Sequence, residues 1–99
     1  MIKHIILWTL KECEETEKAK IKKNIKENLE GLMGKIDGLT EIKVYTDGLA
    51  SSNADLMLDS SFVSEAALKG YAVHPEHVFV ADTFVRPFTA TRSCLDFEI

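Results

Sequence analysis

The chain has 99 residues, of which 45% are hydrophobic and 28% are charged, the usual balance of a folded globular domain. This length suits a single domain, residues 1–99, with a core of its own. The net charge of −4 argues against a nucleic-acid binder, which usually has a basic face, and no stretch approaches the roughly 18 apolar residues of a membrane span. We therefore expect a domain that binds neither nucleic acid nor membrane.

The N-terminal apolar run is too short for a secretory signal and leads directly into charged Lys11 and Glu12. The two cysteines, Cys13 and Cys94, lie far apart in the sequence and belong to no paired motif. Reduced thiols are therefore expected, and these features together predict a cytoplasmic protein.

Residues 2–10 predict a strand that is apolar on both faces. His4 and Trp8 share one face, whereas Ile5 and Leu7 share the other. A small domain with helices on one side of its sheet leaves the opposite side uncovered. The second apolar face therefore indicates a partner subunit.

Between residues 16 and 34, apolar residues recur at steps of three and four, which predicts an amphipathic helix. Thr16 is its expected N-cap, and Gly31 and Gly34 mark its expected end. The apolar stripe comprises Ile21, Ile25, Leu29, Leu32, Met33 and Ile36.

Residues 39–46 and 54–62 alternate in polarity and predict two strands joined as an antiparallel hairpin. Ser64 is the expected N-cap of a short helix that reaches about Tyr71. A second helix is expected from Pro75 until Arg86 and Pro87 stop it. A last strand over residues 88–98 completes an α+β fold, the ferredoxin-like split βαβ, whose four-stranded antiparallel sheet has helices on one face.

The segment from Tyr71 to Val78 concentrates the residues that are hardest to explain as scaffold. His77 is expected in the first turn of the second helix, on the same stripe as Ala81 and Phe84. The positive end of a helix disfavours a protonated imidazole, and a neutral imidazole is a competent general base. Equally, His77 could simply cap or pack at the helix start and bond to a backbone carbonyl or to Tyr71.

Tyr71 could donate a hydrogen bond to a substrate carbonyl, or it could pack in the core with its hydroxyl at the rim. His4 and Trp8 become pocket residues if their face lines a barrel; otherwise His4 is a buried histidine with one backbone partner. His74 and Phe84 complete the expected pocket. His74 and His77 do not supply a standard set of zinc ligands, because the residue before Pro75 is expected to be extended. We therefore expect no metal and no cofactor.

Four segments resemble the stress-responsive dimeric A/B barrel family: Ile2 to Trp8, Ser64-Glu65-Ala66, the pattern Tyr71-x-x-His74-Pro75-x-His77, and the ending Leu95 to Glu98. The resemblance covers essentially the whole chain. It implies a ferredoxin-like protomer whose sheet pairs with a second copy, forming a dimeric α/β barrel.

The resemblance leaves two functions open. The first is that of the many family members linked to stress response: a homodimer, or a higher assembly, that binds a small apolar molecule in its barrel. Members also include a plant polyketide cyclase that works without metal or organic cofactor; by this likeness His77 is the catalytic base, with Tyr71 and His4 beside it. That alternative is a cofactor-independent lyase or cyclase acting on an enolisable substrate. A purely structural assembly would instead fill its interior with side chains such as Trp8 and Met57.

Overall fold

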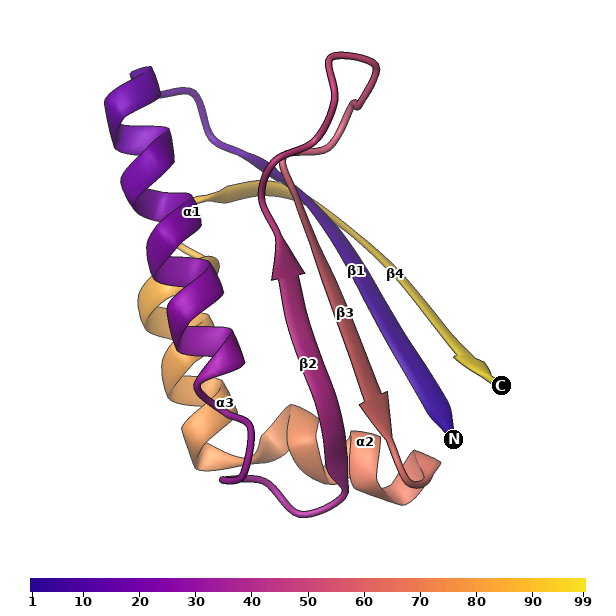
Figure 1. Cartoon of the computed structure of the whole chain (residues 1–99). Helices are drawn as coiled ribbons and strands as arrows, with labels where there is room; N and C mark the ends of the chain where they lie inside the picture. The colour runs from indigo at the N-terminus through magenta and orange to yellow at the C-terminus, as the bar shows by residue number, and fades with distance from the viewer.

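The computed structural model describes residues 1–99 and has the predicted order of elements, strand, helix, strand, strand, broken helix, strand (Figure 1). The second helix is broken into three parts, α2, α3 and a short π-helical turn, η1. The elements are β1 (Ile2–Leu10), α1 (Glu15–Glu30), β2 (Leu39–Tyr45), β3 (Leu56–Phe62), α2 (Glu65–Val73), α3 (Pro75–Val80), η1 (Ala81–Val85) and β4 (Thr89–Glu98).

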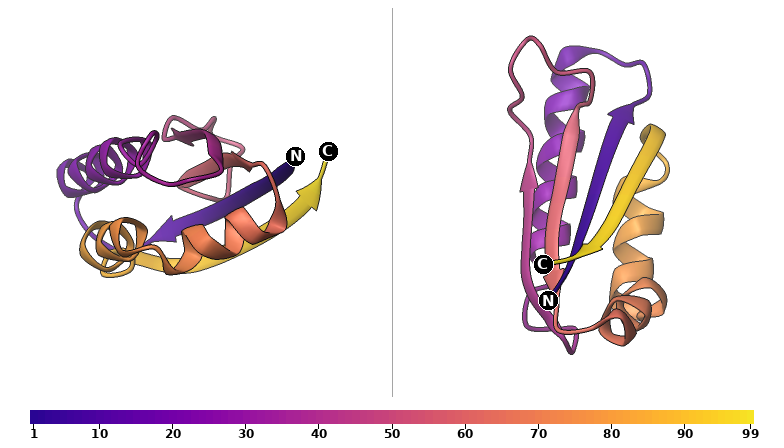
Figure 2. Two further views of the ribbon diagram at one scale, coloured as in Figure 1. Left: turned by 90° about the horizontal axis from the view of Figure 1, so that it is seen from below. Right: turned by 90° about the vertical axis from the view of Figure 1, so that its right-hand side faces the viewer.

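The four strands form one antiparallel sheet in the order β2-β3-β1-β4, so the predicted ferredoxin-like fold is confirmed. The central strand β1 pairs with both β3 and β4; His4 lies opposite Ser60 on one side and Asp96 on the other. Viewed from the side in Figure 2, the strands lie in front of α1 and α3. The helices therefore cover one face of the sheet and leave the other face bare.

The core lies between α1 and the covered face of the sheet. Ile25, Val44 and Phe62 are completely buried there, and burying an aliphatic or aromatic side chain of this size contributes about 1.5–3 kcal/mol. The predicted stripe of α1 is buried except for Met33, which is 49% exposed; Leu32 and Ile36 are buried although they too follow the end of the helix. The N-cap is Glu14 and not Thr16, so the helix begins one residue before the expected cap.

Two contacts fix the loop and strand that follow α1. Glu30 accepts hydrogen bonds from the Lys26 ammonium (2.8 Å) and the Val44 backbone N–H (2.9 Å), which ties the last turn of α1 to β2. Gly38 has a φ of +84°, and a Cβ atom there would lie 2.5 Å from the Cβ of Ala67 in α2. Only glycine fits this turn without strain.

The break between α2 and α3 falls at His74, as the sequence predicts from Pro75. His74 is extended, with φ −66° and ψ 132°, and its Nδ1 accepts the backbone N–H of Glu76 at 3.1 Å, capping α3. After Val80 the helix widens, since the Arg86 N–H bonds to the Ala81 carbonyl five residues earlier. Short π-helical turns of this kind occur often at functional sites.

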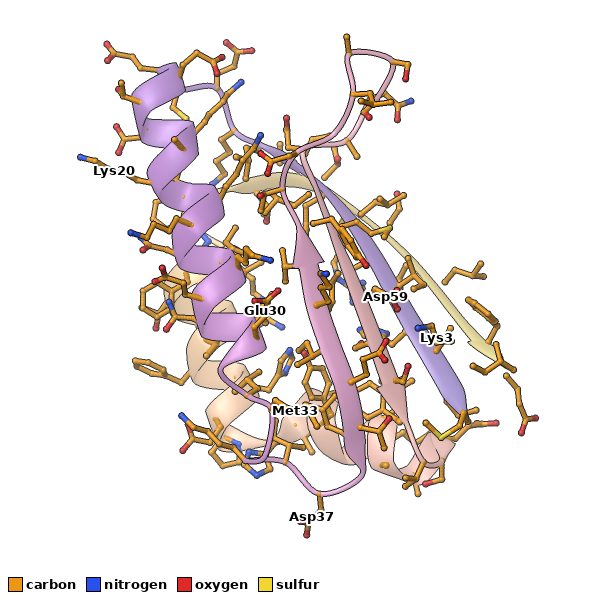
Figure 3. All side chains as sticks on the ribbon, viewed as in Figure 1. Lys3, Lys20, Glu30, Met33, Asp37 and Asp59 are labelled. Carbon is orange, nitrogen blue, oxygen red and sulfur yellow. The ribbon has the colours of Figure 1, made fainter.

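The bare face of the sheet carries apolar side chains beside a group of charged ones, which includes Glu41 and Lys43 of β2. Lys3 and Asp59, neighbours on β1 and β3 in Figure 3, form an ion pair with Nζ and Oδ1 2.5 Å apart. The hydrogen bond to Asp59 raises the pKa of Lys3. Leu7 and Leu95 remain 42% and 64% exposed on this face, so the covering that the sequence predicts for it does not come from the protomer.

Candidate functional site

Three aromatic rings from three elements meet on the covered face of the sheet. His4 comes from β1, Tyr71 from α2 and His77 from α3. The Tyr71 ring lies 4.1 Å from the His77 ring and 6.1 Å from the His4 ring, measured between centroids. Phe62 packs edge-on against Tyr71 at 5.0 Å and supports it from β3. The short segment between α2 and α3 thus brings Tyr71 and His77 together, and the sheet brings His4 to them.

Tyr71 carries a buried hydroxyl that has no hydrogen-bond partner. The residue is 2% exposed, and this burial raises the pKa of its phenol; the positive charge of Arg92 lowers the pKa by a smaller amount. The hydroxyl therefore stays protonated and can donate. An unpaired buried hydroxyl costs about 1–3 kcal/mol, so its persistence here needs a reason.

His77 is held in one tautomer by the backbone. Its Nδ1 lies 3.3 Å from the Ala72 carbonyl oxygen, which can only accept, so Nδ1 carries the proton. Burial lowers the pKa of His77; the bond to Ala72 opposes this effect, while the positive charges of Arg86 and Arg92 add to it. The imidazole is therefore neutral near neutral pH, with an unprotonated Nε2 that has no partner in the protein. The backbone bond considered for His77 from the sequence is present, and it leaves this nitrogen available.

His4 is oriented by Asp96, which lies directly opposite it on β4. Its Nδ1 bonds to a carboxylate oxygen of Asp96, so a neutral His4 also has its Nε2 free. The Cys94 sulfur lies 3.9 Å from the same Nδ1 and 3.5 Å from the same carboxylate oxygen. His4, Cys94 and Asp96 are the only group of metal-ligating side chains close enough to share an ion, with donor atoms within 4.8 Å of one another.

A small cavity of about 80 Å³ adjoins these rings, with room for a small molecule or the reacting end of a larger one. It has two arginines on its wall and no carboxylate. A larger groove of about 660 Å³ runs between α2 and β4 and shares His4 and Arg92 with the cavity. The cavity is lined by His4, Ile6, Trp8, Leu29, Leu58, Tyr71, His77, Ala81, Val85, Arg86, Thr89 and Arg92.

Four of the six residues expected at the site line this cavity: His4, Trp8, Tyr71 and His77. The other two do not. His74 caps α3 and faces a separate surface hollow beside residues 35–38, because its extended backbone turns it away from the helix stripe. The Phe84 ring packs against the Phe79 ring, with 6.4 Å between their centroids. The π-helical turn shifts the phase of the helix, so Val85 lines the cavity where Phe84 was expected.

The location of the site also differs from the expectation. His4 and Trp8 lie on the face that the protomer's own helices cover, so they do not line a space between two sheets. Arg92 and Asp96 are the site residues that sequence reasoning missed. Both alternate with outward-facing residues of β4, but only the pairing of β1 with β4 shows that they reach the cavity and His4.

None of the helices is both long and apolar enough to cross a lipid bilayer. None of the curated proteins compared by sequence matches the chain.

Solved structures resemble the chain over nearly its whole length. A dimeric protein of unknown function with a ferredoxin-like fold, from Bacteroides fragilis, is 30% identical with a TM-score of 0.92, covering 99% of this chain and 95% of that chain. A protein of the Dabb family from Mesorhizobium loti is 19% identical with a TM-score of 0.78, covering 99% and 95%. A hydroxynitrile lyase from Passiflora edulis is 18% identical with a TM-score of 0.79, covering 99% and 92%. At these two lower identities the likeness shows the fold alone.

The sequence itself establishes the family. The family model named Dabb, the stress responsive A/B barrel domain, matches residues 2–99, which is almost the entire chain. The chain therefore belongs to the stress responsive A/B barrel domain family.

Proposed function

We propose that the protein binds a small carbonyl compound in the cavity between β1, α2 and α3 and transfers protons at it, as a lyase or cyclase. The carrying observation is the unpartnered Tyr71 hydroxyl beside the free Nε2 of His77. A buried donor next to a neutral base is the pair that enolate chemistry requires. The binding of a small molecule is common to this proposal and to the simpler one of a binding protein; the unprotonated Nε2 of His77 beside the hydroxyl favours the enzyme.

In the proposed reaction, His77 Nε2 removes a proton from the carbon next to the substrate carbonyl. Tyr71 donates its hydrogen bond to the carbonyl oxygen as that oxygen becomes negative, and the guanidinium of Arg92 adds positive charge on the same side. A positioned base contributes about 10²- to 10⁴-fold to such a step. Both groups belong to the chain, so the reaction needs no metal or organic cofactor.

His4 is available for a second proton transfer. Asp96 bonds to its Nδ1 and so fixes the ring, which leaves Nε2 free to accept or donate. Deprotonation followed by cleavage or closure of a carbon–carbon bond needs such a second group to protonate the product. The lyase from Passiflora edulis has the same fold, which supports the view that this scaffold can hold a lyase site.

The test measures hydrogen–deuterium exchange at the acidic carbon of a β-keto compound in deuterated buffer by NMR, which requires no knowledge of the natural product. We expect His77→Ala to abolish catalysed exchange while the protein stays folded. His74→Ala is the matched control: it changes the same residue type three positions away and outside the cavity, and should keep the exchange rate while losing about 1 kcal/mol of stability with its cap. Undiminished exchange in folded His77→Ala would refute the role of His77.

We further infer that the protein works in a reducing cytoplasm, which suits its two free cysteines. We also infer that two copies associate through the bare face of the sheet. Support comes from the exposed Leu7, Tyr45 and Leu95 on that face and from the Bacteroides fragilis protein, which is described as dimeric. Large exposed apolar patches mark interaction sites. Sedimentation at micromolar concentration should give the mass of a dimer, and Leu95→Asp should give a monomer; a wild-type monomer would contradict this inference.

A further inference from the structure

We propose that His4, Cys94 and Asp96 form a binding site for a zinc-like divalent metal ion, with an open coordination position facing the groove beside α2. This site does not depend on the proposed acid–base reaction.

The antiparallel register brings the three donors together. Cys94 and Asp96 stand two residues apart on β4, so both point to the covered face, and Asp96 lies opposite His4 on β1. The sulfur lies 3.9 Å from His4 Nδ1 and 3.5 Å from the Asp96 oxygen. Zinc bonds of about 2.0–2.3 Å in a tetrahedral site place donor atoms about 3.3–3.8 Å apart. The sulfur distances nearly meet this geometry, and the His4–Asp96 hydrogen bond must open by roughly 1 Å to admit the ion.

The donor set selects the type of ion. A sulfur, an imidazole nitrogen and a carboxylate oxygen suit Zn²⁺ and Co²⁺, whereas Mg²⁺ and Ca²⁺ prefer oxygen ligands alone. One thiolate and one carboxylate neutralise the two positive charges. All three residues line the groove of about 660 Å³, so an ion can enter from solvent and keep a water molecule as its fourth ligand.

Binding of the ion rearranges two protons. The Cys94 thiol releases its proton to solvent and binds as thiolate. The ion replaces the proton on His4 Nδ1, and the imidazole remains neutral with its proton on Nε2. The bound ion and the His4–Asp96 hydrogen bond therefore exclude each other, and Nε2 changes from an acceptor to a donor.

The sequence does not indicate this metal site, because its ligands have no local spacing that would identify them. His4 and Cys94 are 90 residues apart, and neither matches a metal motif. The histidines that stand together in the sequence, His74 and His77, are directed to different places by the helix break.

The experiment titrates the metal-free, full-length protein with Co²⁺ and follows its absorption spectrum without any substrate. We expect a near-ultraviolet thiolate-to-cobalt band that saturates at one ion per chain and disappears on addition of Zn²⁺. Cys94→Ser should abolish the band. Asp96→Asn should weaken binding by at least the roughly 10- to 100-fold that loss of a supporting contact costs. Cys13→Ser, which changes the other free thiol, is the matched control and should keep the band.

The absence of a thiolate band in the wild-type protein would overturn the proposal outright, with no variant required. A band that persists in Cys94→Ser and is lost in Cys13→Ser would also overturn the proposal, because it would place the ion at Cys13. Cys94 and Asp96 are exposed, so circular dichroism should confirm that these variants fold. The exchange reaction of the metal-free protein is measured separately, so failure of either proposal leaves the other standing.

Discussion

Replacing Tyr71 by Phe removes one hydroxyl group, and we expect this change to raise stability while it lowers activity. The hydroxyl is buried without a partner, and such a group costs the folded state about 1–3 kcal/mol. The phenyl ring keeps its contacts with Phe62 and His77. A net gain of about 1 kcal/mol corresponds to a rise in melting temperature of about 4–8 °C in a domain of this size.

The same hydroxyl is the proposed donor to the substrate oxygen. Loss of one such donor costs about 10²- to 10³-fold in rate, so deuterium exchange should fall by that factor. The assay pairs thermal unfolding at fixed protein concentration with the exchange rate, and Tyr45→Phe on the bare face should change the exchange rate little. A fall in stability of 1 kcal/mol or more would mean that the hydroxyl has a partner, and an unchanged exchange rate would remove Tyr71 from the reaction.

Three other expectations can be checked with standard methods. Because the pKa of His77 is lowered, its basic form persists as pH falls, and the exchange rate should stay level from neutral pH to below the ordinary histidine pKa of about 6.5 before it drops; a drop centred at or above that value would contradict the lowered pKa. Gly38→Ala should destabilise the protein by more than about 1 kcal/mol in urea unfolding, owing to its positive φ and the nearby Ala67, whereas Gly70→Ala meets no atom within 4 Å and should not. Burial alone would raise the pKa of Glu30, but its hydrogen bonds lower that pKa. The stabilisation from Glu30 is therefore present above the unfolded-state pKa and is lost as pH falls through the folded-state pKa. The loss of stability in Glu30→Gln should shrink in acid, and a loss that stays constant with pH would contradict this expectation.

The order of elements could be predicted because local patterns determine it. Alternation in β3 and the three- and four-residue steps of α1 give the element types, and Pro75 gives the break. The end of α1 was placed too late, with Met33 inside the stripe, because apolar spacing continues into the loop that carries Leu32 and Ile36 to the core. Periodicity records which residues are buried and does not distinguish a helix from the turn after it.

The residues of the candidate site could be predicted where a local pattern marks them, as it does for His4 and Trp8 on one face of the first strand and for Tyr71 and His77 beside Pro75. Tyr71 and His77 lie six positions apart, on either side of a helix break that Pro75 indicates, so the sequence predicts that they lie close together. Arg92 and Asp96 could not be predicted, because their contact with the site depends on the register between β1 and β4, which pairs the two ends of the chain. Phe84 was misplaced because one extra residue in the helix changes its phase, and nothing in the local composition marks that residue.

The π-helical turn determines which changes of chain length the site can accept. The Arg86 N–H bonds to the carbonyl of Ala81, so residues 81–85 hold one residue more than a regular α-helical turn. Because the wider turn already absorbs that residue, deletion of one residue there would restore regular α-helical spacing and leave Arg86 and the start of β4 close to their present positions. The same deletion within α3 would instead rotate everything after it by about 100° about the helix axis. A one-residue change of length at the π-helical turn therefore alters which side chain of residues 81–85 faces the cavity and spares the cavity residues that follow.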